Sequence, residues 1–147
     1  MTQIKDIIHN LAGRVDSATV KETAYTAADK VFNHQQKAVV VNDERNQACG
    51  IVFEKDVIHA FRSKGKDLLK TPITDIMSID LVAATPNDSI EDALQLMAEK
   101  DIHLLPIIND KGTITDFLSI NDVIRARLND MMDGHKPPKP SEKSSAK

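Results

Sequence analysis

The chain has 147 residues, of which 41% are hydrophobic and only 3% aromatic, so it fits one domain or two closely joined halves with an aliphatic core. Its formal net charge of -3 gives no general attraction to polyanions, which argues against nucleic acid as a partner. It has no apolar run of the roughly 18 residues that a membrane span needs, no signal-peptide pattern at its start and one cysteine, Cys49, which together predict a cytoplasmic protein without disulfides.

The first half of the chain predicts a short apolar-periodic segment, a long helix, two strands and a short helix. Thr19 and Glu22 have the spacing of a capping box, although the repeat described below would start the long helix nearer Glu22. We expect the buried face of this helix to carry Ala24, Ala27, Ala28, Val31 and Phe32. The predicted elements are the apolar-periodic segment at residues 4–11, helices at 19–35 and 56–61, and strands at 38–41 and 49–53.

The second half gives the clearest pattern, in the order helix, strand, strand, helix. Apolar residues recur at i, i+3, i+4, i+7 and i+8 from Ile90 onward, and Asp88 followed by Glu91 supplies the predicted N-terminal cap. Two apolar strands then flank a turn that contains Gly112, which predicts a hairpin. The predicted elements are a helix within residues 85–100 that follows the Asp88 cap, a helix from 121 to about 132, and strands at 104–108 and 114–118.

The two halves repeat the same pattern. When Thr85 is laid on Thr19, Asp122-Val123-Ile124 falls on Asp56-Val57-Ile58 without a gap, and we call this superposition the repeat alignment. A second echo, between residues 73–77 and 4–8, requires a slightly longer shift. Each unit alone is too small to bury both faces of its two strands, so we expect the two copies to cover each other's apolar faces.

A polar tail follows the two copies. Residues 133–147 contain three prolines and four lysines and no large apolar residue. Such a composition cannot bury enough surface to offset the entropy lost on ordering. We therefore expect the tail to be disordered, and to be a solvated end rather than a site for a partner.

These repeated units resemble CBS domains, which occur as tandem pairs called Bateman modules. In the second copy the resemblance depends on His103-Leu104-Leu105-Pro106-Ile107-Ile108 and Phe117-Leu118-Ser119-Ile120-Asn121-Asp122. The first copy matches less well, because Val40 stands in place of the proline and Phe53 in place of the usual serine or threonine. The resemblance implies an α+β fold of two repeats with pseudo-two-fold symmetry, each a small sheet with flanking helices. It implies repeats at residues 4–68 and 69–132, followed by the disordered tail at 133–147.

The same resemblance implies a non-catalytic regulatory module that binds an adenosine-containing ligand in the cleft between its repeats and signals to an effector protein. The ligands it implies are AMP, ADP, ATP, NAD or S-adenosylmethionine, with no prosthetic group and no metal. By position, Ser119 would contact phosphate, whereas Asp122 and Asp56 would contact the ribose. The base pocket would be lined by Ala84, Thr85, His103, Leu105 and Pro106.

The chemistry of these residues allows both the binding roles and a purely structural one. A helix N-terminus offers unpaired N–H groups and a partial positive charge to a phosphate, and a carboxylate accepts hydrogen bonds from vicinal ribose hydroxyls. The pair Ser119 and Asp122 can instead serve only to start its helix. Asp56 has no hydroxyl partner at position 53, but it can favour the helix dipole without any ligand. If the ligand site is real, Asp122→Ala should weaken the binding of adenosine compounds strongly.

Two departures from the family pattern weigh against nucleotide binding. Asp116 stands where the family has glycine, and its charge beside the expected phosphate position would repel a second negative charge. Phe53 would occupy the phosphate end of the first site, so at most one intact site is predicted. Phe53 itself is expected in the core rather than stacked on adenine.

No pattern in the sequence predicts catalysis. The five histidines lack the spacing of a metal site, and no phosphate-binding glycine loop, nucleophile elbow or pair of catalytic acids is present. The resemblance implies a disc-shaped homodimer. Two other functions stay open: a ligand-free module for dimerisation and interaction, and, with least support, nucleic-acid binding through the basic tail. A packing or dimer face is predicted for the apolar stripe of Ile120, Val123, Ile124, Leu128, Met131 and Met132.

Overall fold

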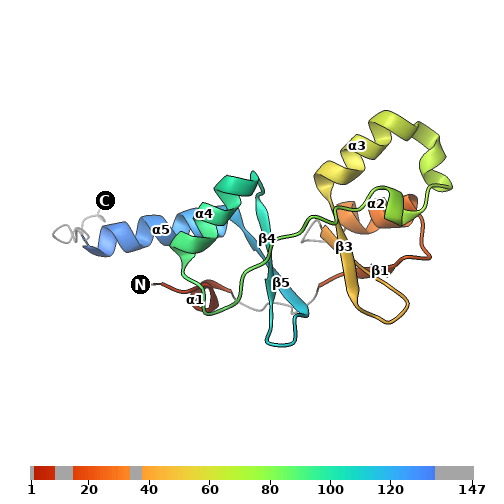
Figure 1. Ribbon diagram of the computed structural model, residues 1–147. Coiled ribbons are helices and arrows are strands. Elements are labelled where there is room, and N and C mark those ends of the chain that lie inside the picture. The colour runs from red at the N-terminus through yellow and green to blue at the C-terminus, as the bar shows by residue number, and fades with distance from the viewer. Residues whose placement is uncertain (1, 9–14, 34–37, 135–147) are drawn as a thin grey trace.

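The structure is a computed structural model that describes residues 2–8, 15–33 and 38–134. It has the predicted α+β fold, in which two small sheets flanked by helices form two lobes joined by an extended linker (Figure 1). The predicted tail lies outside the described residues, except that the last helix continues to Gly134. None of the described helices combines the length and the apolar character that a membrane crossing requires.

Each lobe contains one sheet and two longer helices (Figure 1). The first lobe consists of β1 (Ser17–Thr19), α2 (Ala24–Asn33), β2 (Ala38–Asn42), β3 (Ala48–Phe53) and α3 (Glu54–Lys64). The short 3-10 helices η1 (Gly65–Leu69) and η2 (Ile73–Asp75) follow it. The second lobe consists of α4 (Ile90–Lys100), β4 (Leu104–Ile108), β5 (Ile114–Ser119) and α5 (Ile120–Gly134), with α1 (Ile4–Ile7) lying against it.

The strand pairings of the two lobes are related by the repeat alignment that the sequence shows. In the first lobe Val39 pairs with Val52, and in the second Leu105 pairs with Leu118, which are the aligned positions. Each hairpin also has a register irregularity at the same distance along its first strand. The sequence repeat is therefore a structural repeat, as predicted.

Residues 17–19 form a strand, and the prediction that a helix begins at Thr19 is wrong. Ala18 is buried and pairs in parallel with Val41, and the equivalent Ala84 makes an isolated parallel bridge to Ile107. Helix α2 starts only at Ala24. Pairing with β2 holds residues 17–19 in an extended conformation. This tertiary contact decides the conformation at Thr19, where the local sequence alone suggested the first turn of a helix.

The cap of α4 also differs from the prediction. Ser89 is the capping residue, and its hydroxyl oxygen accepts a hydrogen bond from the Asp92 N–H at 3.1 Å. The predicted cap, Asp88, instead accepts from the Thr85 N–H at 2.9 Å and closes the loop that leads to the helix. Both side chains have a local hydrogen-bonding role, and only the serine lies at the helix boundary.

The first segment of each repeat packs on the opposite lobe. Ile4 is fully buried in the second-lobe core with Ile90, whereas Ile73 is fully buried in the first-lobe core. The Ile4 N–H donates to the Asp88 carbonyl at 2.9 Å, and the Ile73 N–H donates to the Glu22 carbonyl at 3.0 Å. The lobes therefore exchange their leading segments, and these segments cross the proposed division between residues 68 and 69.

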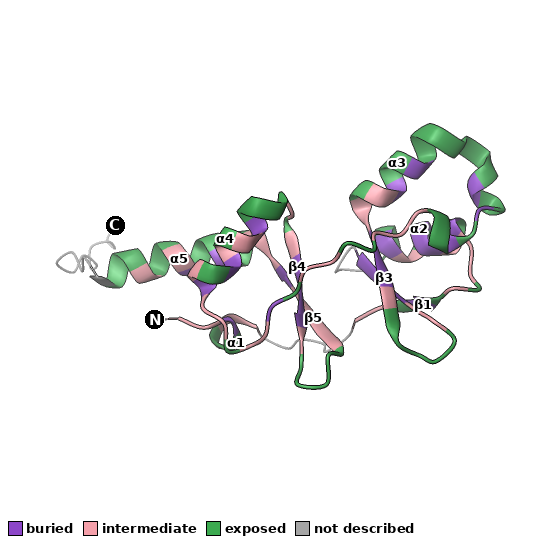
Figure 2. Ribbon diagram, viewed as in Figure 1, coloured by how far each residue is buried: buried purple, intermediate pink, exposed green. Residues whose placement is uncertain are grey.

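The helices bury one face each and leave the other exposed (Figure 2). In α2 the predicted inner positions Ala24, Ala27, Ala28 and Val31 are buried. Phe32 was also predicted to be inside, but 49% of it is exposed. It follows Val31 directly, and one further residue along a helix turns the side chain about 100° away from the buried stripe.

Candidate ligand site between the two lobes

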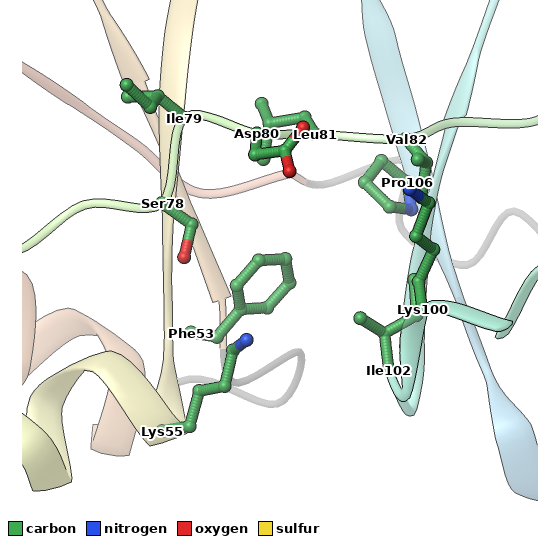
Figure 3. Close-up of a pocket in the computed structure, with 10 residues that line it drawn as sticks. All are labelled: Phe53, Lys55, Ser78, Ile79, Asp80, Leu81, Val82, Lys100, Ile102 and Pro106. Carbon is green, nitrogen blue, oxygen red and sulfur yellow. The ribbon is translucent and has the colours of Figure 1, made fainter. Parts of the chain in front are cut away.

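A cavity of about 330 Å³ lies between the two lobes (Figure 3). Its walls come from the start of α3 in the first lobe, from the linker at residues 78–82, and from the end of α4 and the strand β4 in the second lobe. The lobes contribute Phe53 and Lys55 from the first, and Lys100, Ile102 and Pro106 from the second.

Phe53 reaches the cavity because β3 continues into α3 without a loop. Its N–H donates to the Asp56 carboxylate at 2.9 Å, a contact that fixes the first turn of the helix. The ring is half-buried and faces the cavity, so the prediction that Phe53 belongs to the core is wrong (Figure 3). The ring lines the cavity and leaves space beside it.

Asp56 is tied to the linker by a side-chain contact. The Ser78 hydroxyl lies 3.0 Å from both oxygens of the Asp56 carboxylate. The backbone of Ser78 also pairs with Ile51 on β3, with the Ser78 N–H donating at 2.8 Å and its carbonyl accepting at 3.0 Å. The carboxylate thus holds the linker to the start of α3, and Ser78 rather than Asp56 faces the cavity.

Ser119 and Asp122 occupy the equivalent junction of strand and helix in the second lobe, and neither lines this cavity. The Ser119 hydroxyl oxygen accepts from the Asp122 N–H at 3.3 Å and so caps α5. The Asp122 carboxylate lies 3.3 Å from the Arg125 guanidinium, and its side chain is 52% exposed. The structure does not bring Asp56 and Asp122 together in one pocket.

The five residues predicted for the base pocket divide between the cavity, the core and the surface. Pro106 lines the cavity. Leu105 is fully buried in the second-lobe core, and Ala84 is buried with its N–H donating to the Pro106 carbonyl at 3.0 Å. Thr85 begins the loop before α4, and His103 is exposed, with its carbonyl accepting from the first residue of α5.

The pseudo-two-fold relation explains why the predicted residues separate. Phe53 and Pro106 both line the cavity. In the repeat alignment Phe53 is equivalent to Ser119, and Pro106 is equivalent to Val40. Ser119 therefore belongs to the symmetry-related position on the other side of the pair. The counterparts of the α4 end at that position are residues 34 and 36, which lie outside the described residues.

Asp116 lies half-buried on β5, opposite Ile107. Burial raises the pKa of its carboxyl, and a hydrogen bond with the Thr115 side chain partly opposes the rise. The folded chain therefore holds this proton more tightly than the unfolded chain, so ionising Asp116 lowers stability as the pH rises past the ordinary aspartate pKa. Asp116 does not line the cavity. The sequence predicted that its charge would repel a phosphate at Ser119, which lies at the junction of β5 and α5.

Sequence reasoning missed the linker and the two lysines. The linker carries no family motif, and Lys55 lies between the motif positions Phe53 and Asp56 without belonging to the motif itself. One feature of the repeat could have indicated the linker. Residues 73–77 echo residues 4–8, and the linker follows immediately after this echo, which packs on the first lobe. Within residues 2–8, 15–33 and 38–134, no three His, Cys, Asp or Glu side chains are grouped so as to hold a metal ion.

Comparisons with known proteins place the chain in a family. The sequence model described as "CBS domain" matches residues 73–129. CBS domain-containing protein YhcV of Bacillus subtilis is 30% identical over 84% of this chain and 84% of its own length. CBS domain-containing protein CBSX3, mitochondrial, of Arabidopsis thaliana is 32% identical over 85% of this chain, which spans only 64% of CBSX3.

Solved structures agree with the sequence matches. The CBS-domain containing protein ATU1752 from Agrobacterium tumefaciens has a TM-score of 0.76 at 25% identity, covering 86% of this chain and 99% of that one. The CBS domain pair of MJ0100, solved with 5-methylthioadenosine and S-adenosyl-L-methionine, has a TM-score of 0.73 at 18% identity, covering 88% and 98%. CBSX2 in complex with AMP has a TM-score of 0.70 at 19% identity, covering 89% and 99%, and these last two show the fold alone.

The match over most of YhcV extends across both lobes, whereas the family model covers η2, the linker and most of the second lobe. The match to YhcV confirms the prediction that this chain is a pair of CBS repeats. The chain belongs to the family of CBS-domain proteins.

Proposed function

We propose that this chain is a regulatory module that binds an adenosine-containing ligand between its two repeats and signals to a partner protein. The observation that carries the proposal is a cavity whose walls come from both lobes and from the linker. A ligand held there contacts all three parts at once, so its binding free energy favours one arrangement of the lobes over others. The adenosyl ligands in MJ0100 and CBSX2 support the choice of ligand class.

The cavity offers a suitable surface to each part of such a ligand. Phe53, Ile102 and Pro106 supply apolar surface for an adenine ring. The start of α3 adjoins the cavity and provides the N–H groups and partial positive charge that favour a phosphate. Asp56, directly behind Ser78, supplies the acceptors for ribose hydroxyls.

The contact between Ser78 and Asp56 gives a route for the signal. Ribose hydroxyls that bind the carboxylate compete with the Ser78 hydroxyl for the same two oxygens. Displacing Ser78 loosens the tie between the linker and α3. Ligand binding is thereby coupled to the segment that joins the two lobes.

Asp56→Ala is expected to weaken the binding of an adenosine ligand by about tenfold, since it removes a charged acceptor of ribose hydrogen bonds. A thermal-shift screen of AMP, ADP, ATP, NAD and S-adenosylmethionine identifies the ligand, because binding to the native state raises the melting temperature. Isothermal titration calorimetry with the best compound then measures the affinity of the variant.

Two further variants serve as controls. Ser78→Ala removes the competing hydroxyl and keeps the carboxylate, so its affinity should equal or exceed that of the wild type. Asp122→Ala tests the original sequence-based expectation: a loss confined to this variant would place the ligand at the symmetry-related position. If none of the compounds binds, the adenosyl proposal is wrong.

We also propose that the chain forms a homodimer through α3 and α5. Ile58 on α3 and Ile124 on α5 are equivalent in the repeat alignment, and they are 55% and 42% exposed. Leu128 and Met131 extend the exposed apolar stripe along α5. Two equivalent apolar faces related by a pseudo-two-fold axis suit a second copy of the same chain, and this surface also favours the alternative of a ligand-free interaction module.

Light scattering is expected to give the mass of a dimer at micromolar concentration. Leu128→Glu should shift the mass to that of a monomer, because it places a charge in the apolar interface. Phe32→Glu, on the exposed side of α2, should leave the dimer intact. A monomeric wild type would exclude the dimer. The cytoplasmic location stays a prediction, and the relative CBSX3 is named as mitochondrial.

A further inference from the structure

We propose that the cavity selects ligands that carry a chain of phosphates, and that Lys55 and Lys100 determine this selectivity. The inference depends on the proposed function, because it assigns the ligand class of the same site. It distinguishes ADP and ATP from 5-methylthioadenosine, which is neutral, and from S-adenosylmethionine, which has a sulfonium cation.

The two lysines reach the cavity from different lobes (Figure 3). Lys55 lies in the first turn of α3, and Lys100 is the last residue of α4. Among the residues of the cavity wall, Asp80 on the linker carries the one negative charge against these two positive charges. The ion pairs among the described residues involve neither lysine, so both ammonium groups are available to an anion.

Lys55 stands in the first turn of α3 between two acidic residues, Glu54 and Asp56. The N-terminal turn of a helix has a partial positive charge, which disfavours a cation and favours a bound anion. The Lys55 ammonium lies 6.0 Å from the centre of the Phe53 ring, a cation–π distance that holds the cation over the cavity wall. A phosphate group bound between the helix start and Lys55 would be stabilised by both.

Lys100 also stabilises its own helix, because a cation at the C-terminus of a helix interacts favourably with the dipole of that helix. Its part in the proposal comes from its place in the second lobe, opposite Lys55. A chain of two or three phosphates is longer than a single phosphate, so it is better able to reach the lysines of both lobes. Such a ligand also draws the two lobes together across the linker.

Calorimetry on the full chain tests the proposal with ATP, ADP, AMP, 5-methylthioadenosine and S-adenosylmethionine at low and physiological salt. ATP is expected to bind at least about tenfold more tightly than AMP, with an affinity that falls as salt screens the charges. Lys55→Gln and Lys100→Gln should each weaken ATP binding by roughly tenfold and leave the binding of 5-methylthioadenosine unchanged. Inorganic tripolyphosphate should compete with ATP.

Lys66→Gln is the matched control, because Lys66 is an exposed lysine on η1 outside the cavity wall. Melting temperatures of the three variants should agree with the wild type, since all three side chains lie outside the core. If 5-methylthioadenosine or S-adenosylmethionine binds as tightly as ATP, or if neither lysine variant changes ATP binding, the selectivity is overturned while the adenosyl site stands. If no compound binds, both proposals are overturned.

Discussion

Ile4→Ala should lower the free energy of unfolding by about 2–5 kcal/mol, the range for removing a large aliphatic side chain from a core. Ile4 is fully buried, although it lies near the start of the chain in a short helix. It fills the core of the second lobe beside Ile90 and Met97, so the loss falls on a lobe to which Ile4 does not belong by sequence. Denaturant unfolding followed by circular dichroism measures the change.

Two further substitutions serve as comparisons for Ile4→Ala, one in the other core and one on the surface. Ile73→Ala removes the equivalent side chain from the core of the first lobe and should cost a similar amount. Lys5→Ala changes the exposed neighbour of Ile4 on α1 and should stay within about 0.5 kcal/mol of the wild type. A cost below about 1 kcal/mol for Ile4→Ala would show that α1 does not complete the second-lobe core.

Gly50→Val should lower the free energy of unfolding by about 1–3 kcal/mol, because there is no space for a side chain at this position of β3. A Cβ atom on Gly50 would lie 2.5 Å from the Met77 sulfur and 3.1 Å from the Ser78 carbonyl oxygen. Valine therefore forces the linker away from the strand edge and weakens the pairing of Ser78 with Ile51. Ligand affinity should fall together with stability.

A double-mutant cycle with Met77→Ala separates the causes. The thioether is the closest obstacle, so its removal should relieve part of the cost of Gly50→Val. Ala48→Val on the same strand places the same side chain at an exposed position and should be nearly neutral. Equal costs for Gly50→Val in the presence and absence of Met77 would rule out the thioether as the source of the strain.

The repeat was the part of the fold that sequence could predict best. Patterns of apolar residues located β2, β3, β4, β5 and most of the helices, and the repeat alignment reappears in the strand pairings. Residues 17–19 were missed as a strand because so short a segment has no periodic signal, and its conformation depends on pairing with β2. Ser89 was missed as the cap of α4 because Asp88 beside it is an equally good capping residue by type.

The candidate site was predicted less well than the fold. Motif positions singled out Pro106 and the start of α3, which lie at the cavity, but they grouped residues of two symmetry-related positions into one pocket. Leu105 illustrates the reason: its neighbour Pro106 lines the cavity, and alternation along the strand turns Leu105 into the core. Ser78 and Lys100 enter the cavity only through the relative placement of the lobes, which no local pattern specifies.

The exchange of leading segments means that neither half of the chain is autonomous. A contiguous piece that begins near residue 70 would carry Ile73 away from the core it fills and would leave a vacancy where Ile4 belongs. The stretch at residues 73–129 that matches the CBS family model lacks Ile4, which completes the second-lobe core, so we do not expect this stretch to fold alone. A chain severed within η1 would yield two fragments that each hold the missing piece of the other, and they would regain the native cores only by recombining.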